Sequence, residues 1–132
     1  MYLLDTNICI YALKNKFPEL TEKLLQVDPN DMAVSSVTVG ELEYGAAKSK
    51  WGEQTRTNLY LFLSSFTILP FTADDGIAFG RLRAELERKG TPIGPYDMMI
   101  AAQAITRINT LITHNTDEFL RVSQLAVEDW TV

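Results

Sequence analysis

The chain has 132 residues, a length typical of one domain. Hydrophobic residues make up 46% and charged residues 22% of it, so we expect a single domain over residues 1–132 with its own core. One cysteine, Cys9, and one histidine, His114, exclude an internal disulfide and a zinc site built from thiolates or several histidines. The net charge of −5 differs from the basic footprint usual in nucleic-acid-binding domains.

The sequence shows no signal for export or membrane insertion. Its start, MYLLDTN, lacks the basic and long apolar regions of a signal peptide. The most apolar stretch, residues 59–71, is interrupted by serine, threonine and proline and is shorter than the roughly 20 residues of a membrane span. We therefore expect a cytoplasmic protein, and the single cysteine fits a reducing compartment.

The N-terminal half predicts two strands and three helices. In chain order we expect strand Met1–Leu4, helix Asn7–Leu13, helix Pro18–Gln26, strand Met32–Ser35 and helix Ser36–Lys50. The strands are continuously apolar, as in parallel strands that are covered on both faces. Pro18 suits the first turn of its helix. In the last helix Val39, Leu42 and Ala46 share one face, while Glu41 lies on a different side.

The C-terminal half continues the alternation of helices and short strands. We expect helix Gly52–Ser65, strand Phe66–Leu69, helix Asp74–Lys89, loop Thr91–Gly94, helix Pro95–Arg107, strand Thr110–Thr113, helix Thr116–Arg121 and strand Leu125–Glu128. Gly90 is a stop signal for the helix before it. The predicted buried stripe of the helix that begins at Pro95 consists of Met98, Ala101, Ala102, Ile105 and Ile108.

This alternation predicts an α/β fold. Strands separated by helices need crossover connections, which give a parallel sheet with helices on both faces. In open sheets of this kind, ligands bind outside the carboxyl ends of the strands. Polar side chains that directly follow a strand are therefore the candidates for a functional site.

Asp5 and Asp97 are two such candidates. Asp5 ends the first strand and precedes Thr6 and Asn7, so these residues either cap the next helix or face the crevice at the sheet edge. Asp97 lies in the first turn of a mostly apolar helix, where an acid complements the helix dipole. The same dipole favours the ionised carboxylate that a metal requires, so both interpretations remain open.

Glu41 and the segment after the fourth strand are further candidates. Thr38 and Glu41 fit a capping box, which competes with a functional role for Glu41. The segment after the fourth strand offers hydroxyl, amide and carboxylate groups at Thr113, Asn115, Asp117 and Glu118. Ordinary capping by Asn115 or Thr116 is the alternative explanation. We interpret His114 as a surface loop residue.

The combination is more informative than any single residue. Oxygen ligands from several strand ends, without a histidine cluster, suit Mg²⁺ or Mn²⁺. Such ions activate water and stabilise a phosphoryl displacement, which points to a phosphodiester hydrolase. Bound cations would also invert the local field, so the acidic net charge argues only weakly against a polyanionic substrate.

Four motifs follow one another along the chain. They are MYLLDTN, Ser35-Ser36-x-Thr38-x-x-Glu41-Leu42-x-Tyr44-Gly45-Ala46, Gly90-Thr91-Pro92-Ile93-Gly94-Pro95-Tyr96-Asp97-x-x-Ile100-Ala101 and Thr113-His114-Asn115-Thr116-x-Glu118-Phe119. In this order they resemble the PIN-domain ribonucleases, specifically the VapC-type toxins of bacterial toxin–antitoxin pairs. The terminal Glu128-Asp129-Trp130 is similar as well. The resemblance spans nearly the whole chain and implies a three-layer α/β/α PIN-like domain with a central, mostly parallel sheet of about five short strands.

The resemblance implies an endoribonuclease that depends on Mg²⁺ or Mn²⁺ and cuts RNA, with a structured RNA such as a transfer RNA as the expected substrate. Asp5, Glu41 and Asp97 match the first three acids of the family. Many members carry an aspartate where this chain has Asn115, so Glu118 is the expected fourth metal ligand and Asp117 the alternative. The supporting polar residues are Thr6, Asn7, Thr113, Asn115 and Asp117.

The resemblance also implies partners. We expect a cognate VapB-type antitoxin, a homodimer, and a hetero-oligomer with the antitoxin that binds operator DNA through the antitoxin. Tyr44, Trp51 and Tyr60 are candidates for such surfaces, whereas Phe62 fits the core better. Cations near the acids are candidates for RNA contact or are plain surface charges, namely Lys14, Lys16, Lys48, Lys50 and Arg83.

Three alternatives make different demands on the sequence. A haloacid-dehalogenase-like phosphatase needs a second aspartate two residues after the first, where this chain has Asn7. A receiver domain needs an aspartate at the tip of the third strand, which here ends in Leu69 and Pro70. A catalytically weak PIN-like module that acts by binding protein or RNA would show no cleavage with either ion.

Overall fold

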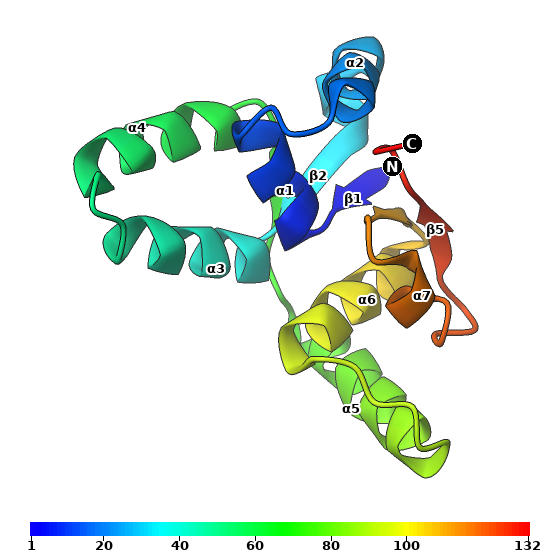
Figure 1. The fold of residues 1–132 in the computed structure, drawn as a ribbon. Coiled ribbons are helices and arrows are strands. Elements are labelled where there is room, and N and C mark those ends of the chain that lie inside the picture. The colour runs from blue at the N-terminus through cyan, green and yellow to red at the C-terminus, as the bar shows by residue number, and fades with distance from the viewer.

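The five strands of the protein form one sheet in which all neighbours are parallel. The computed structural model describes residues 1–132. The strands are β1 (Tyr2–Leu4), β2 (Met32–Ser35), β3 (Thr67–Leu69), β4 (Thr110–Ile112) and β5 (Ala126–Glu128), in the order β3-β2-β1-β4-β5 (Figure 1). The predicted α/β fold is confirmed, and the sheet is wholly rather than mostly parallel.

The helices connect the strands as the sequence predicts. They are α1 (Thr6–Leu13), α2 (Pro18–Gln26), α3 (Ser36–Ala47), α4 (Gly52–Leu63), α5 (Ala73–Arg88), α6 (Pro95–Arg107) and α7 (Thr116–Phe119). Most predicted bounds differ from these by one to three residues, chiefly because helix ends were placed too late, as at Lys50, Ser65 and Arg121. A short 3₁₀ helix at Pro29–Asp31 was not predicted.

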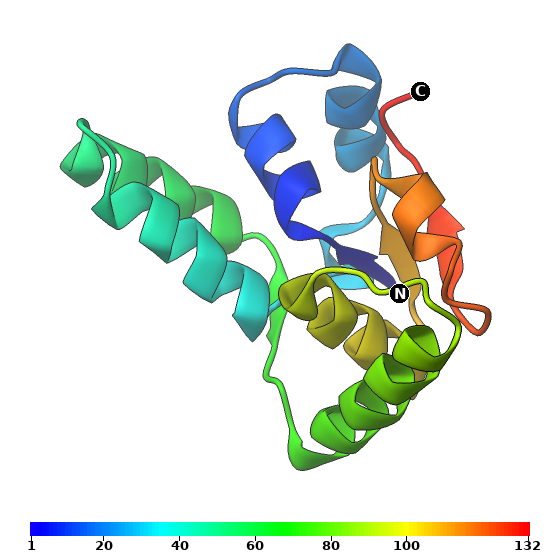
Figure 2. The same ribbon diagram turned by 60° about the horizontal axis from the view of Figure 1, so that its bottom comes forward.

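Each face of the sheet has its own core, and neighbouring residues of a strand alternate between them. Leu3 packs with α5, α6 and α7, whereas Leu4 packs with α1 to α4. The two views in Figures 1 and 2 show these helix layers on opposite sides of the sheet. Leu3 and Leu4 are both fully buried, which explains why this strand is continuously apolar. The three-layer α/β/α architecture is therefore confirmed.

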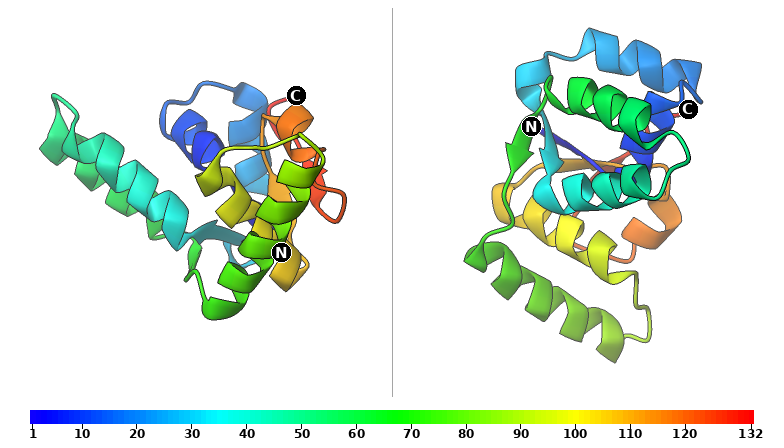
Figure 3. Two further views of the ribbon diagram at one scale, coloured as in Figure 1. Left: turned by 90° about the horizontal axis from the view of Figure 1, so that it is seen from below. Right: turned by 90° about the vertical axis from the view of Figure 1, so that its left-hand side faces the viewer.

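Helices α3 and α4 form an antiparallel arm that projects from the sheet (Figure 3). Large aromatic side chains stand exposed on it: Tyr44 at 66%, Trp51 at 68% and Tyr60 at 75%. Phe62 lies at the base of the arm, against Phe66 and the core, with 4.9 Å between the two ring centroids. The arm thus offers a surface that the domain's own core leaves uncovered.

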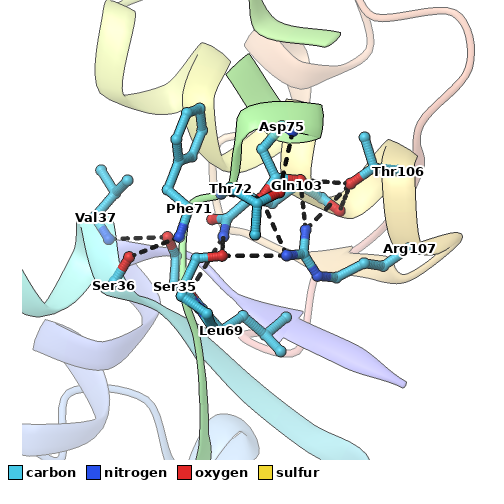
Figure 4. A network of polar contacts seen from close by, with 11 residues as sticks. Ser35, Ser36, Val37, Leu69, Phe71, Thr72, Asp75, Gln103, Thr106 and Arg107 are labelled. Atoms are coloured by element: carbon cyan, nitrogen blue, oxygen red, sulfur yellow. Dashed lines mark hydrogen bonds and ion pairs between the residues drawn. The ribbon is translucent and has the colours of Figure 1, made fainter. Parts of the chain in front are cut away.

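A buried ion pair joins the start of α5 to the end of α6 (Figure 4). Asp75 is 1% exposed, and its Oδ1 and Oδ2 accept hydrogen bonds from Arg107 at 2.6 and 3.0 Å. Asp75 also completes a capping box with Thr72. Arg107 and Gln103 donate to the carbonyl oxygen of Pro70, so the same network holds the segment between β3 and α5.

Two sequence interpretations are wrong at this level. Ile108 does not belong to the buried stripe of α6, because the helix ends at Arg107 and Ile108, in the left-handed region at φ 54°, is 92% exposed. Thr38 does not cap α3, because the N-cap is Ser35, whose hydroxyl accepts from the Val37 N–H at 2.9 Å. No helix is long and apolar enough to cross a membrane.

Candidate active site

The candidate site lies where the chain changes direction across the sheet. From β1 the chain builds outward through β2 to β3 and then returns to place β4 on the other side of β1. Such a switch point leaves a crevice at the carboxyl ends of the two strands. The Asp5 N–H donates to the Ile112 carbonyl oxygen at 3.0 Å, so Asp5 and the residues after β4 share this crevice.

Asp5 is a buried carboxylate as well as a helix cap. Its side chain is at the N-cap of α1, where Oδ1 accepts from the Ile8 N–H at 2.8 Å. Burial raises the pKa of Asp5 to about 6, against the opposing effects of the Thr113 hydroxyl and the Ile8 N–H. The residue is only 3% exposed. The same side chain therefore caps α1 and remains a candidate for the functional site.

Asp97 is the residue on which the other acids converge. It lies in the first turn of α6, which begins at Pro95. Burial raises its pKa to about 6, with further contributions from the charges of Glu118, Asp5 and Glu41. The charges of the other three predicted carboxylates thus all reach Asp97.

A chain of hydroxyl groups orients Glu41. The Thr6 hydroxyl donates to Glu41 Oε1 at 2.6 Å and lies 3.0 Å from the Thr38 hydroxyl. Because Thr6 has one hydroxyl proton, Thr38 is the donor in the second bond. Thr38 is fully buried. Its side chain therefore supports the site rather than the helix end, a role that sequence reasoning missed although Thr38 belongs to the second motif.

Glu118 lies at the rim of the site and is held in place by neutral donors. Its Oε1 accepts from the Gly94 N–H at 3.4 Å, and its Oε2 accepts a hydrogen bond from the Asn115 amide. The Asn115 side chain therefore orients the Glu118 carboxylate. Gly94 directly precedes the helix of Asp97, so Glu118 also fixes the loop that positions Asp97.

The remaining predicted residues play smaller parts. Thr113 is fully buried beside Asp5, and its hydroxyl accepts from the Asn115 N–H at 3.0 Å. Asn7 is exposed in the first turn of α1. Asp117 is exposed, and its charge is not among those that raise the pKa of Asp97. The structure therefore brings Thr6, Thr113 and Asn115 to the site and leaves Asn7 and Asp117 at its edge.

The donor set fits a hard divalent cation that keeps part of its water shell. No three acidic, histidine or cysteine side chains lie close enough to enclose an ion by themselves. Mg²⁺ commonly binds through one or two carboxylates and several waters, which requires no such cage. Asp5 and Asp97, whose pKa values are raised by burial and by neighbouring acids, would gain most from a nearby positive charge, and the ligand atoms of the site are all oxygen.

Comparison with known proteins decides the family. The sequence profile of the PIN domain matches residues 2–125. The chain belongs to the PIN-domain family. It is 44% identical over 132 residues to Ribonuclease VapC2 of Rickettsia felis, with 98% of each chain covered. It is 42% identical over 129 residues to the tRNA(fMet)-specific endonuclease VapC of Salmonella typhimurium, covering 98% of this chain and 97% of that protein.

Solved structures of PIN domains share the whole fold. A chain of the R. felis VapBC2 complex bound to a promoter DNA fragment matches with a TM-score of 0.92 and 41% identity, covering 98% of both chains. A chain of DNA-bound VapBC from S. typhimurium matches with a TM-score of 0.93 and 41% identity, covering 98% of this chain and 97% of that chain. Both matching chains were thus solved in VapBC structures bound to DNA.

Proposed function

We propose that this PIN domain is an endoribonuclease toxin that depends on Mg²⁺ or Mn²⁺. The observation that carries the proposal is the convergence of Asp5, Glu41, Asp97 and Glu118 from four separate segments, with the pKa of Asp5 and Asp97 both raised to about 6. Ordinary structural acids avoid one another, whereas a cluster that repels itself is typical of a metal or catalytic site.

The chain's own groups prepare this site for metal and phosphate. A divalent cation, when bound, supplies an activated water and offsets the charge of the phosphate. With a pKa of about 6, Asp5 and Asp97 are mostly ionised at neutral pH and can receive the cation. The Ile8 N–H fixes Asp5, and the Thr6 hydroxyl fixes Glu41. Their positions are therefore set before the substrate arrives.

The direct test is cleavage of total RNA by purified protein that is free of any antitoxin. We expect cuts with Mg²⁺ or Mn²⁺ and none with EDTA, and no cuts by Asp97→Asn under either condition. Cleavage by Asp97→Asn at the wild-type rate would contradict the assignment. Absence of cleavage by the wild type with both ions would support the alternative of a non-catalytic binding module.

We infer that the substrate is a structured RNA such as a transfer RNA. The support is the relative from S. typhimurium that is named as a tRNA(fMet)-specific endonuclease and is 42% identical over 129 residues. Sequencing the cut ends from the total-RNA reaction tests this inference. Cuts concentrated in one transfer RNA are expected, and cuts spread over messenger RNA would contradict it.

We propose that a VapB-type antitoxin neutralises the protein in the cytoplasm, as partner of a homodimer, and that the complex binds operator DNA through the antitoxin. A groove of about 460 Å³ between α1, α3 and α4 has Glu41 on its wall. A partner segment in this groove would cover Glu41 and hinder access of RNA to the site. Co-expression with the antitoxin should give one co-eluting complex without ribonuclease activity, and an active complex would contradict this part.

A further inference from the structure

Beside the acid site, three aromatic rings form a compact group, two of which also pack partly against the hydrophobic core. The ring centroids of Tyr11 and Phe17 are 5.2 Å apart, and the His114 ring lies 5.9 Å from Tyr11 and 5.3 Å from Phe17. Lys16 covers the group, with its Nζ 4.7 Å from the centre of Tyr11 and 5.5 Å from that of Phe17. We call these four residues the aromatic platform.

The platform adjoins the acids through two segments of the chain. Tyr11 lies six residues after Asp5 on α1, or about 9 Å along the helix axis. His114 stands between Thr113 and Asn115, which both face the acid site. The charge of His114 also acts on Asp5, so a nucleotide next to a phosphate at the acids would lie near this group.

The platform is fixed in position yet open to solvent. The His114 Nδ1 lies 2.8 Å from the Thr131 hydroxyl and 3.3 Å from Asp129 Oδ2, which sets the orientation of the ring. The His114 side chain nevertheless remains 46% exposed, and Lys16 is exposed as well. Packing against the core explains why the inner edges of Tyr11 and Phe17 are buried. It does not explain the fixed orientation of His114 or the position of Lys16 over the rings.

We propose that the aromatic platform stacks a nucleobase of the RNA and so positions the nucleotide next to the scissile phosphate. This inference rests on the proposed endoribonuclease function. The half-exposed His114 ring offers a face that accepts any base, and Lys16, which lies over Tyr11 and Phe17, can neutralise the neighbouring phosphate. The platform is therefore an RNA-binding element. It positions the RNA strand relative to the acids and takes no part in the bond cleavage.

Photocrosslinking locates the bound RNA without cleavage. Total RNA containing 4-thiouridine is irradiated with the wild-type protein in EDTA, and the crosslinked peptides are mapped by mass spectrometry. We expect crosslinks at Tyr11, Phe17 or His114. Crosslinks only at other exposed aromatic residues, such as Tyr44 and Trp51 on the arm, would overturn the proposal. The absence of any crosslink at the platform would do the same.

Kinetics with matched variants test the positioning role. Lys16→Gln and Tyr11→Leu should each raise KM for RNA on the order of tenfold and leave kcat nearly unchanged, as expected when one stacked base is lost. Tyr11→Phe keeps the ring and should behave as the wild type. Lys23→Gln is the control for lysine, because Lys23 is also exposed and lies 5.8 Å from the centre of the Trp130 ring.

The outcomes separate this inference from the function on which it rests. If the wild type cuts RNA but Tyr11→Leu and Tyr11→Phe have the same KM, only the platform is wrong. If the wild type cuts no RNA with either ion, the proposed function is wrong whatever the crosslinks show. A thermal melt of each variant identifies any that fail to fold, and Lys16→Gln, which changes an exposed side chain, then remains as the test.

Discussion

At the first turn of α6, Asp97 experiences two opposing electrostatic effects. The helix dipole stabilises a carboxylate at this position by about 0.3–1 kcal/mol. Burial and the charges of Glu118, Asp5 and Glu41 instead raise its pKa from 3.8 to about 6, which disfavours the ionised form. The second effect is larger, so Asp97 in the metal-free protein is held at a cost in stability.

Substitution of Asp5 or Asp97 by asparagine should therefore separate activity from stability. Either variant should lose at least about 100-fold in RNA cleavage, since groups that merely orient metal ligands already change affinity or activity by about 10–100-fold. Either should also unfold at higher urea concentration than the wild type at pH 8 in EDTA. Asparagine still caps α1 at position 5, so the cap is preserved.

Asp117→Asn is the matched control for these variants. Asp117 is an exposed acid of α7 and does not affect the pKa of Asp97. We expect its cleavage rate to equal that of the wild type and its unfolding free energy to change by less than about 0.5 kcal/mol. A loss of activity in Asp117→Asn would instead make Asp117 the fourth functional acid.

Between α5 and α6, stability depends on one buried ion pair. Arg107→Met leaves Asp75 with a buried charge that has lost its partner, which typically costs about 3–5 kcal/mol. Urea unfolding at pH 7 should show this loss. Arg83→Met is the control, because the Arg83–Glu87 pair is exposed and such pairs contribute less than about 1 kcal/mol. Equal losses in the two variants would contradict the role of burial.

The elements and the acids were predictable from sequence to different degrees. The strands, such as the run Leu3-Leu4, were predicted because they depend on local pattern. The position of the acids that follow them was predicted as well, because it depends on the topology of parallel sheets. The end of α6 was missed, because a non-glycine residue rarely adopts the left-handed conformation of Ile108. The bond from Thr6 to Glu41 was also missed, since it depends on how α1 packs against α3.

For the whole molecule, metal-free stability should be greatest near pH 4 to 5. Asp5 and Asp97 have pKa values of about 6 when folded and an ordinary value of 3.8, so their contribution is full below that value and is lost as pH rises through 6. The Arg107 guanidinium holds the pKa of Asp75 well below its ordinary value despite burial, so its contribution is lost as pH falls below about 4.

Urea unfolding from pH 3 to 8 in EDTA measures this profile. For Asp5 alone, the shift corresponds to a loss on the order of 3 kcal/mol between pH 4 and 8. The Asp5→Asn variant should lack this part of the slope, while its acid limb below pH 4 should remain. A wild-type stability that rises steadily from pH 5 to 8 would contradict the raised pKa values.

Added Mg²⁺ or Mn²⁺ should reverse the alkaline slope. An ion that binds only the folded protein stabilises it according to its concentration relative to Kd, by about 2.7 kcal/mol at 100 times Kd. Because the ligands must be ionised, this gain should be large at pH 8 and small at pH 5. Melting temperature in each ion measures it, and an equal gain in Asp97→Asn would place the ion elsewhere.

The pairing of β1 with β4 determines when the protein becomes capable of activity during its synthesis. Residues 2–4 pair with residues 110–112, so the crevice around Asp5 does not exist until the last fifth of the chain has been made. At a synthesis rate of about 5–20 residues per second, roughly 5 to 20 s pass between the synthesis of β1 and that of β4. A nascent chain that stops before β4 carries Asp5, Glu41 and Asp97 but no assembled centre. The order of the strands thus delays assembly of the candidate site until synthesis is nearly complete.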